Sequence, residues 1–324
     1  SDVDNSTCLG SRSWYYGLDN KSGDDIDLVV VLLHELAHGL GMSGALNPAN
    51  GEFFLPTKMP SIFERHTLDL GTGLFFDQMT AAQRRAAVIN DNLTVWAGER
   101  TRHAASQVLS ATTTLRIADP SPAAGTYAIN PATFGPSVEA MPIAGRIVAA
   151  LDAADEAGPT TTDGCSPYSN ASEMAGRVAL VDRGTCTFVN KALLAQAAGA
   201  IGIIVINNVA CGLPPMGGES SDVLIPAIGI SKSDGDLLRE QIASGVDGAL
   251  RLDPSTRSGA STSGFVRLYV PCEVEPGSSM YHWDITTTPN LLMEPFISED
   301  LPHGVDISLQ QLLDIVANTL LAEL

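Results

Sequence analysis

The sequence predicts an α+β fold in which an inserted domain of mixed β and α type divides a larger domain into two segments. Two observations lead to this prediction. A strongly apolar helix pattern runs from about residue 26 to residue 40. Between about residues 110 and 260 the composition changes to short β-branched runs broken by Gly and Pro. We therefore expect residues 1–109 and 261–324 to form the larger domain and residues 110–260 to form the insertion.

Length, composition and charge restrict the possible functions. A chain of 324 residues is long enough for two domains of roughly 150 residues each. The net charge of −19 would repel a phosphate backbone, and no basic stripe with interleaved aromatic residues offsets it, so we expect no nucleic-acid partner. No apolar run approaches the ~20 residues of a membrane span, and we expect a protein that is not membrane-integral.

The beginning of the sequence and the cysteines favour an exported protein. Ser1 to Asp4 carry neither an initiator Met nor a basic and apolar leader, which suggests that a signal or pro-segment has been removed. The five cysteines lack CxxC spacing, which argues against a structural zinc knuckle and fits one or two disulfides with one thiol left over. We expect a secreted, extracellular protein.

The helix pattern has start and stop signals and carries three polar residues. Asp24 and Asp25 offer N-cap oxygens, while Gly39 and Gly41 supply the end. The apolar residues between them, Leu28 to Leu33 above all, cover more than one stripe and predict a helix that is buried nearly all round. Polar side chains in such a helix are costly unless they have a ligand.

Those polar residues form the motif HELAHGLG at residues 34–41. His34 and His38 are four residues apart, so both imidazoles can face one cation and provide two ligands of a tetrahedral zinc site. Glu35 lies about 100° around the helix, where its carboxylate can act as the general base of a metallopeptidase. A five-residue motif also arises by chance, but the apolar helix and the turn expected at Gly41 argue for a functional site.

A catalytic zinc needs a third protein ligand, and the residues leave several candidates. Glu64 would complete a gluzincin-type site, yet Ser61 and Glu64 also form the S-x-x-E pattern of a capping box, which needs no metal. His66 is near in sequence but lacks a supporting turn, while His103 and His303 belong to no motif.

Two segments near the C-terminus carry a family resemblance. They are Ser278-Ser279-Met280-Tyr281-His282-Trp283-Asp284 and Asn290-Leu291-Leu292-Met293-Glu294-Pro295. Together with HExxHxxG they resemble the leishmanolysin-type metzincin peptidases, in which a long insertion separates the motif from the third histidine and a Met-turn follows. The compact metzincin motif HExxHxxGxxH is broken here, because its last position is Gly44.

The resemblance implies a secreted zinc metalloendopeptidase that acts on protein or peptide substrates. It implies His34, His38 and His282 as zinc ligands, Glu35 as the base and Met293 as the Met-turn residue. It also implies that residues 296–304 line a specificity pocket. Metzincins build a twisted sheet before the zinc helix, whereas only a short polar segment precedes Asp24, which suggests that part of the catalytic domain is missing.

Four segments of the insertion carry a second family resemblance: GRVALVDRGTCTF at residues 176–188, an Ala-rich helix over 188–198, the strand GIIVIN at 202–207 and IPAIGI at 225–230. Together they resemble the protease-associated (PA) domain. The resemblance implies a noncatalytic accessory domain that helps with substrate access or protein contacts, so Asp182 and Arg183 are assigned no chemistry. Cys165 and Cys186 are candidates to pair.

Three other functions stay open from the sequence. They are a gluzincin-like peptidase that uses Glu64, an aminopeptidase-type enzyme with an amine-binding carboxylate, and a protein-binding module whose metal is structural. A structural zinc would have four protein ligands and no open position. Zinc is the expected cofactor, and calcium sites cannot be assigned. From Leu309 onward, with Leu312, Leu313 and Val316, the spacing predicts a final amphipathic helix.

Overall fold

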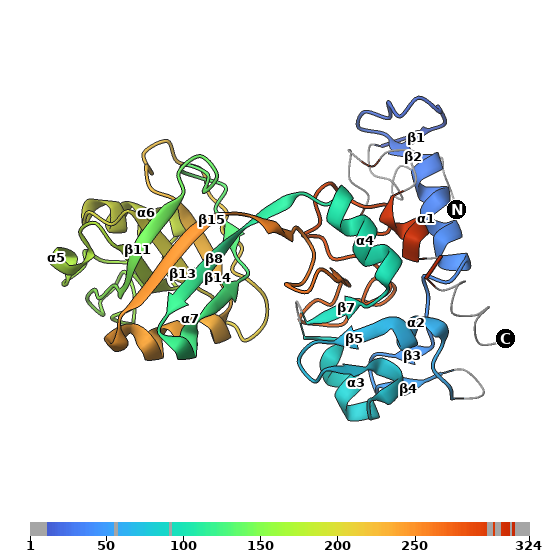
Figure 1. Ribbon diagram of the computed structural model, residues 1–324. Coiled ribbons are helices and arrows are strands. Elements are labelled where there is room, and N and C mark those ends of the chain that lie inside the picture. The colour runs from blue at the N-terminus through green and yellow to red at the C-terminus, as the bar shows by residue number, and fades with distance from the viewer. Residues whose placement is uncertain are drawn as a thin grey trace. The chain divides into compact units, whose positions relative to one another are not determined.

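The chain folds into two compact units, Ser1–Ser110 with Thr256–Leu324 and Ala111–Ser255. They are seen in a computed structural model that describes residues 12–54, 58–90, 93–296, 301, 306–311, 313 and 314. The ribbon in Figure 1 is coloured along the chain, and the first unit contains segments from both ends of the colour scale. The unit boundaries fall close to the limits expected for the insertion.

The first unit holds short strands and small helices around the zinc-motif helix. Its strands are β1 (Trp14–Tyr15), β2 (Ile26–Asp27), β3 (Leu46–Asn47), β4 (Glu52–Phe53), β5 (Thr67–Asp69), β6 (Leu74–Phe75), β7 (Thr94–Trp96) and β16 (Val266–Arg267). Its helices are α1 (Leu28–Gly39), α2 (Ile62–His66), η1 (Phe76–Gln78), α3 (Ala81–Ala87) and α4 (Glu99–Val108). The order β16-β7-β5-β6 forms an antiparallel sheet, so residue 266 from the second segment pairs with Trp96 of the first.

Helix α1 begins later than the sequence suggested. Its N-cap is Asp27, whose carboxylate accepts from the backbone N–H groups of Val29 and Val30. The prediction of Asp24 or Asp25 as the cap was wrong because Ile26 and Asp27 are extended and pair with β1, so the first free N–H groups of the helix lie near Asp27. The helix ends at Gly39 as expected, and Gly41 has a positive φ of 127°.

The prediction that α1 is buried nearly all round was also wrong. Leu32, Leu36 and Leu40 are 52%, 60% and 67% exposed. They recur every four residues and therefore form one stripe along the helix, about half a turn away from His34 and His38. Val30 and Ala37 are buried, so among the described residues the helix packs through one side only.

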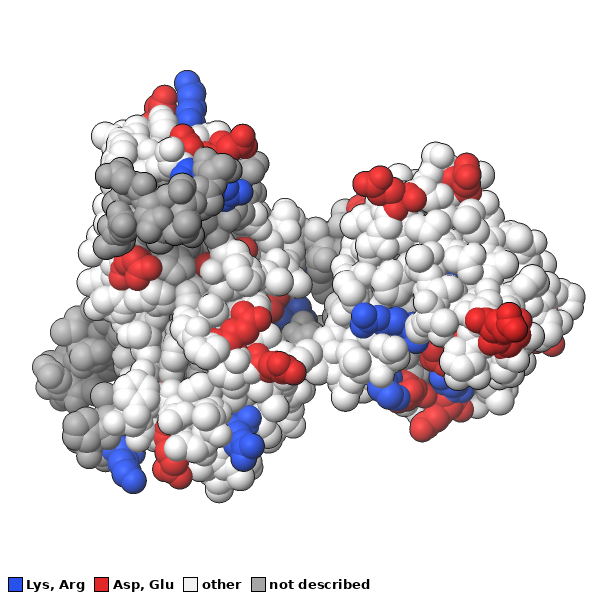
Figure 2. All heavy atoms as spheres, turned by 180° about the vertical axis from the view of Figure 1, so that it is seen from behind, with Lys and Arg blue, Asp and Glu red and all other residues white. Residues whose placement is uncertain are grey.

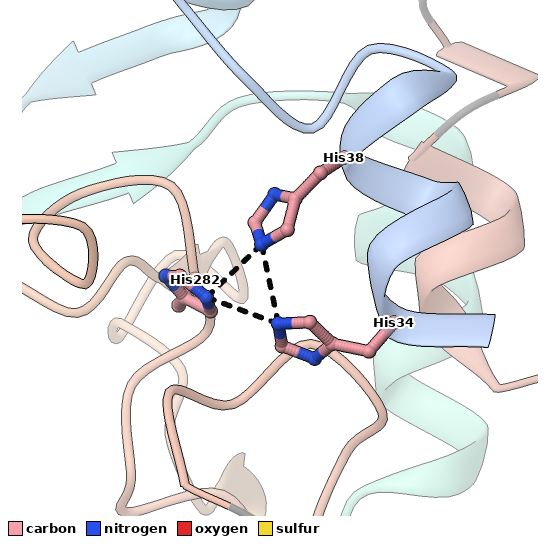
Figure 3. A group of neighbouring side chains, drawn as sticks. All are labelled: His34, His38 and His282. Atoms are coloured by element: carbon pink, nitrogen blue, oxygen red, sulfur yellow. Dashed lines mark hydrogen bonds between the residues drawn. The ribbon is translucent and has the colours of Figure 1, made fainter. Parts of the chain in front are cut away.

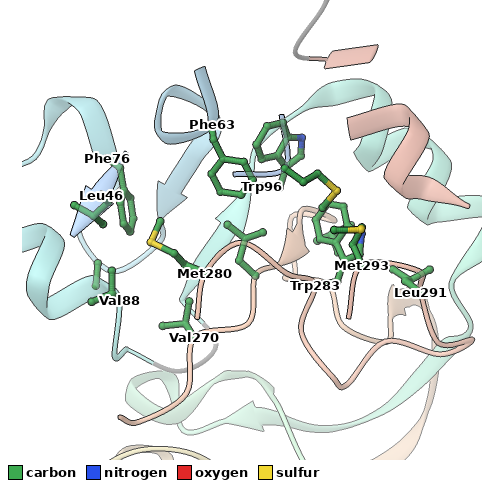
Figure 4. Close-up of a cluster of buried hydrophobic side chains, with 14 of the residues drawn as sticks. Leu46, Phe63, Phe76, Val88, Trp96, Val270, Met280, Trp283, Leu291 and Met293 are labelled. Carbon is green, nitrogen blue, oxygen red and sulfur yellow. The ribbon is translucent and has the colours of Figure 1, made fainter. Parts of the chain in front are cut away.

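The core of the first unit joins the two chain segments. Phe63 and Trp96 from the first segment pack with Trp283 and Met293 from the second, and each of these side chains is fully buried (Figure 4). The Phe63 and Trp96 rings are 5.0 Å apart between centroids. Burial of such large aromatic side chains contributes a large part of the hydrophobic stabilisation. The segment that carries His282 is thus anchored on the same core as the segment that follows α1.

The second unit is built on one mixed sheet. The strands are β8 (Ala111–Asp119), β9 (Gly125–Tyr127), β10 (Asn130–Pro131), β11 (Ile143–Ala149), β12 (Val178–Asp182), β13 (Gly202–Ile206), β14 (Ala227–Ile230) and β15 (Val246–Arg257). Their order is β10-β14-β13-β12-β11-β15-β8-β9, and β11, β12, β13 and β14 run parallel. The helices are η2 (Ser121–Ala123), α5 (Ala171–Met174), α6 (Phe188–Ala197), α7 (Lys232–Gln241) and η3 (Ile242–Ser244).

The elements expected in the insertion are confirmed. Strands β12 and β13 are parallel neighbours joined by α6, which is the predicted βαβ unit. All residues of β13 are buried, as an uninterrupted apolar run in a parallel strand requires. Cys165 and Cys186 form a disulfide. Cys211 and Cys272 are disulfide-bonded as well, while Cys8 lies outside the described residues.

The remaining predictions on the surface and the C-terminus can be compared only in part. Residues 307–311, 313 and 314 are helical, while Leu312 and Val316 lie outside the described residues. Within the described ranges, no helix has both the length and the apolar character that crossing a membrane requires. On the face shown in Figure 2, acidic and basic side chains are interspersed without an extended basic patch.

Candidate metal centre

Three histidines from distant parts of the chain converge on one point. His34 and His38 project from α1, one turn apart, and His282 comes from the segment after β16 (Figure 3). The Nε2 atoms lie 3.1 Å apart between His34 and His38, 3.2 Å between His34 and His282, and 3.2 Å between His38 and His282. Among the described residues, this is the group of histidine, cysteine and acidic side chains that could hold a metal ion.

The other nitrogen of each ring is held by the backbone. Nδ1 lies 2.7 Å from a carbonyl oxygen in all three cases, namely Leu292 for His34, Met42 for His38 and Ser278 for His282. A carbonyl can only accept, so Nδ1 carries the proton and donates it in each ring. In the neutral imidazole Nε2 then bears a lone pair and no hydrogen.

The short Nε2 contacts therefore cannot be hydrogen bonds between neutral rings. Three lone pairs that face one another repel, and fully protonated rings would bring three positive charges together. A cation among the three nitrogens removes this conflict. In an ideal tetrahedral zinc site with bonds of ~2.0–2.1 Å, two ligand atoms are about 3.3–3.4 Å apart, which the observed separations of 3.1–3.2 Å approach. The three histidines thus fit a zinc ion with a fourth position left for another ligand.

The surroundings of His34 and His282 favour the neutral ring, which is the state that binds a metal. Burial lowers the pKa of His34, and the Leu292 carbonyl opposes this effect only in part. Burial also lowers the pKa of His282 to about 4, with further lowering by His38 and His34. His282 is only 4% exposed. A metal ligand must be unprotonated, so these shifts favour coordination at neutral pH.

Glu35 stands beside the triad and outside it. It follows His34 directly on α1 and its side chain is exposed to solvent. One residue corresponds to about 100° of rotation, so the carboxylate does not share the face of His34 and His38. Glu35 is not one of the residues whose side chains meet at this point.

The alternative third ligands lie elsewhere. Glu64 is fully buried and forms the predicted capping box of α2, because Ser61 N donates to its Oε2 at 2.7 Å. His66 stacks on Trp96 with ring centroids 4.8 Å apart. His103 is exposed and contacts Gln107 on α4. His303 lies outside the described residues, so the comparison covers Glu64, His66 and His103 only.

Met293 lies in a turn that supports His34. The Met293 side chain is fully buried, and its carbonyl accepts from Trp283 N at 2.8 Å. The preceding residue, Leu292, provides the carbonyl that accepts from His34. The turn thus links the backbone next to His282 with the ring of His34. Of the expected pocket wall at residues 296–304, only residues 296 and 301 are described.

The comparisons with known proteins bear mainly on the insertion. Residues 143–238 match the family model of the PA domain. The second unit contains a PA domain. "Probable leucine aminopeptidase 2" of Aspergillus fumigatus is 35% identical over 85 residues, which make up 25% of this chain and 17% of that protein. "ER degradation-enhancing alpha-mannosidase-like protein 3" of Xenopus laevis is 31% identical over 119 residues, or 34% of this chain and 13% of that protein.

A solved structure gives a weaker likeness. A zinc aminopeptidase from Bacillus subtilis is 22% identical and has a TM-score of 0.30, covering 47% of this chain and 36% of that one. At this score the two structures are too different for a shared fold or activity to be inferred. The chain spans 13–26% of the length of the curated relatives that it matches here. These relatives include aminopeptidases and a mannosidase-like protein, so the shared part does not by itself determine the chemistry.

Proposed function

We propose that this protein is a zinc-dependent peptidase. The observation that carries the proposal is the convergence of three histidine Nε2 atoms within 3.2 Å of one another, with Glu35 next in sequence to His34. Three histidines with an open fourth position are typical of a catalytic zinc, whereas a structural zinc has four protein ligands. The protein-binding module with a structural metal is therefore the less favoured function.

The chain's own residues have distinct roles in this proposal. His34, His38 and His282 hold the ion, and the carbonyls of Leu292, Met42 and Ser278 fix their orientation. A bound zinc supplies a Lewis acid for the scissile carbonyl. Glu35 accepts the proton of the attacking water and passes it to the leaving amine, as a general base and then a general acid. Peptide-bond hydrolysis is the reaction that this set of groups can perform.

The type of peptidase has two candidates, and different observations favour each. The single-metal triad and the resemblance to leishmanolysin-type enzymes favour an endopeptidase. The names of several relatives favour an aminopeptidase, although each match covers a small part of both chains. An aminopeptidase needs a fixed group that binds the free α-amine of its substrate, such as a carboxylate beside the metal.

A pair of matched peptides separates the two types. The zinc-loaded protein is given the same internal sequence once with a free N-terminus and once N-acetylated, and products are identified by mass. An endopeptidase cleaves both peptides internally, while an aminopeptidase releases single residues from the free form alone. A chelator should stop either activity, and readdition of zinc should restore it. Absence of hydrolysis in a protein shown to contain one zinc would contradict the proposal.

A further inference from the structure

The Glu64 carboxylate, one of the candidate third ligands, is instead the centre of a hydrogen-bond network. Its Oε1 accepts from Ala45 N at 2.8 Å, Leu46 N at 3.3 Å and the Tyr281 hydroxyl at 3.1 Å. Its Oε2 accepts from Ser61 N. Glu64 has no exposed surface, and four donors satisfy its charge. Such a carboxylate is costly to bury unless it is fully bonded, so this network is strongly specified.

The network connects the two segments that supply the metal ligands. Ala45 and Leu46 lie where the segment after α1 enters β3, and the same segment provides the Met42 carbonyl bonded to His38. Tyr281 directly precedes His282 in the other segment, and its hydroxyl also lies 3.2 Å from Leu46 N. The hydroxyl therefore reaches both the Glu64 carboxylate and the backbone after α1.

Gly44 shows why the network and a local third histidine exclude each other. Gly44 occupies the position at which the compact motif has its last histidine. A Cβ atom there would overlap the Glu64 carboxylate and the Tyr281 ring. Any side chain at residue 44 would have to displace both groups. The space beside the turn is thus filled by the residues that fix the segment of the distant histidine.

We propose that Glu64 and Tyr281 are positioning residues for the zinc site: their hydrogen bond fixes the segment of His282 against the turn after α1. This inference rests on the proposed zinc site. Tyr281 cannot reach the ion through its hydroxyl while that hydroxyl is bonded to Glu64 and Leu46, so it acts through its neighbour His282. Glu64 and Tyr281 thus fill the space that a local third ligand would need, and they hold the segment of the distant ligand His282 in place.

The test compares Tyr281→Phe and Glu64→Gln with the unchanged chain in zinc affinity, measured by competition with a chromophoric chelator. Tyr281→Phe keeps the ring and loses only the hydroxyl. Glu64→Gln keeps the volume but places an N–H₂ group or a weaker acceptor opposite Ser61 N. Both variants should bind zinc about tenfold to a hundredfold more weakly, as loss of outer-shell partners typically does. The absorption spectrum of the Co²⁺-substituted protein should change in the same variants, because the ligand geometry relaxes.

Thr67→Val is the matched control. The Thr67 hydroxyl donates to the Phe63 carbonyl at 3.0 Å in the same core and is fully buried. Loss of the Thr67 hydroxyl should lower the free energy of unfolding about as much as loss of the Tyr281 hydroxyl does. Zinc affinity and the Co²⁺ spectrum should stay unchanged in Thr67→Val. If Tyr281→Phe and Glu64→Gln behave like Thr67→Val, the positioning role is refuted and the zinc site stands. If the unchanged chain itself binds no zinc, the proposed function fails with it.

Discussion

Some residues of the candidate metal site can be predicted from the sequence, and others cannot. The spacing of His34 and His38 indicates a shared helix face, and the structure brings their rings together as that spacing predicts. His282 is 244 residues away from His38, and only family resemblance pointed to it. The carbonyls of Met42, Ser278 and Leu292 carry no sequence signal, because every residue has a carbonyl. Glu64 was ambiguous, since one pattern suits both a ligand and a cap.

Glu35→Gln tests the base at the residue scale. The amide cannot accept the proton of the attacking water, so turnover should fall by about 10²–10⁴. Zinc content and unfolding temperature should be unchanged, because Glu35 is exposed and lies off the face of the ligands. Steady-state peptide hydrolysis and metal analysis on one preparation provide the measurement. A variant that contains zinc and turns over at the normal rate would remove Glu35 from the mechanism.

At the scale of elements, the sequence predicted the kind of each main element better than its ends and its exposed faces. The buried strands β12 and β13 and helix α6 have the expected places, since apolar runs that alternate with a helix pattern have few other arrangements. Helix α1 begins at Leu28 because pairing with β1 claims the residues before it. Its exposed leucines show that an apolar run specifies a helix without specifying what covers it.

Two leucine substitutions test whether the exposed leucines of α1 contribute less to stability than a leucine of the core. Leu36 on α1 is 60% exposed, whereas Leu46, the first residue of β3, is 1% exposed. Leu36→Ala should change the free energy of unfolding by less than ~0.5 kcal/mol, whereas Leu46→Ala should lower it by ~2–5 kcal/mol. Tryptophan fluorescence in urea reports the first unit, because Trp14, Trp96 and Trp283 all belong to it. Equal losses would mean that the leucine stripe is covered in solution.

Removal of the metal should loosen particular segments. Without zinc the three Nε2 lone pairs face one another, so His282 and the turn at Met293 lose the interaction that holds them to α1. Amide hydrogen exchange of residues 278–283 and 291–294 should rise strongly in the metal-free protein, while β12 and β13 keep their protection. Protection that is identical with and without zinc would contradict the view that metal binding organises these segments.

At the scale of the whole chain, the sequence-based limits of the insertion can be set beside the limits of the two compact units. The second compact unit is Ala111–Ser255, and the chain leaves and re-enters the first unit at neighbouring points, since Ser258 N donates to the Ser110 carbonyl at 3.0 Å. A domain with adjacent ends can be inserted into a loop without disturbing its host. Composition does not predict which side of α1 is exposed, because burial depends on the elements that pack against the helix.

Excision of residues 111–255 tests whether the PA domain is noncatalytic. Because Ser110 and Ser258 are already hydrogen-bonded, a short Gly-Ser linker can join residue 110 to residue 256. Hydrolysis of a short peptide should be largely retained, and cleavage of a folded protein substrate is the comparison that reveals an accessory role. A shortened protein that binds zinc, remains folded and has lost all peptide hydrolysis would show that the PA domain takes part in the chemistry.

The most direct test of the account is the identity of the third ligand. We would measure the zinc coordination of the unchanged chain by X-ray absorption spectroscopy, together with the zinc content of His282→Ala, Glu64→Gln and His66→Ala. The account predicts three imidazoles and one water-type ligand, loss of zinc and activity in His282→Ala, weaker but retained binding in Glu64→Gln, and normal binding in His66→Ala. A carboxylate in the coordination sphere, with full zinc content in His282→Ala and none in Glu64→Gln, would contradict it.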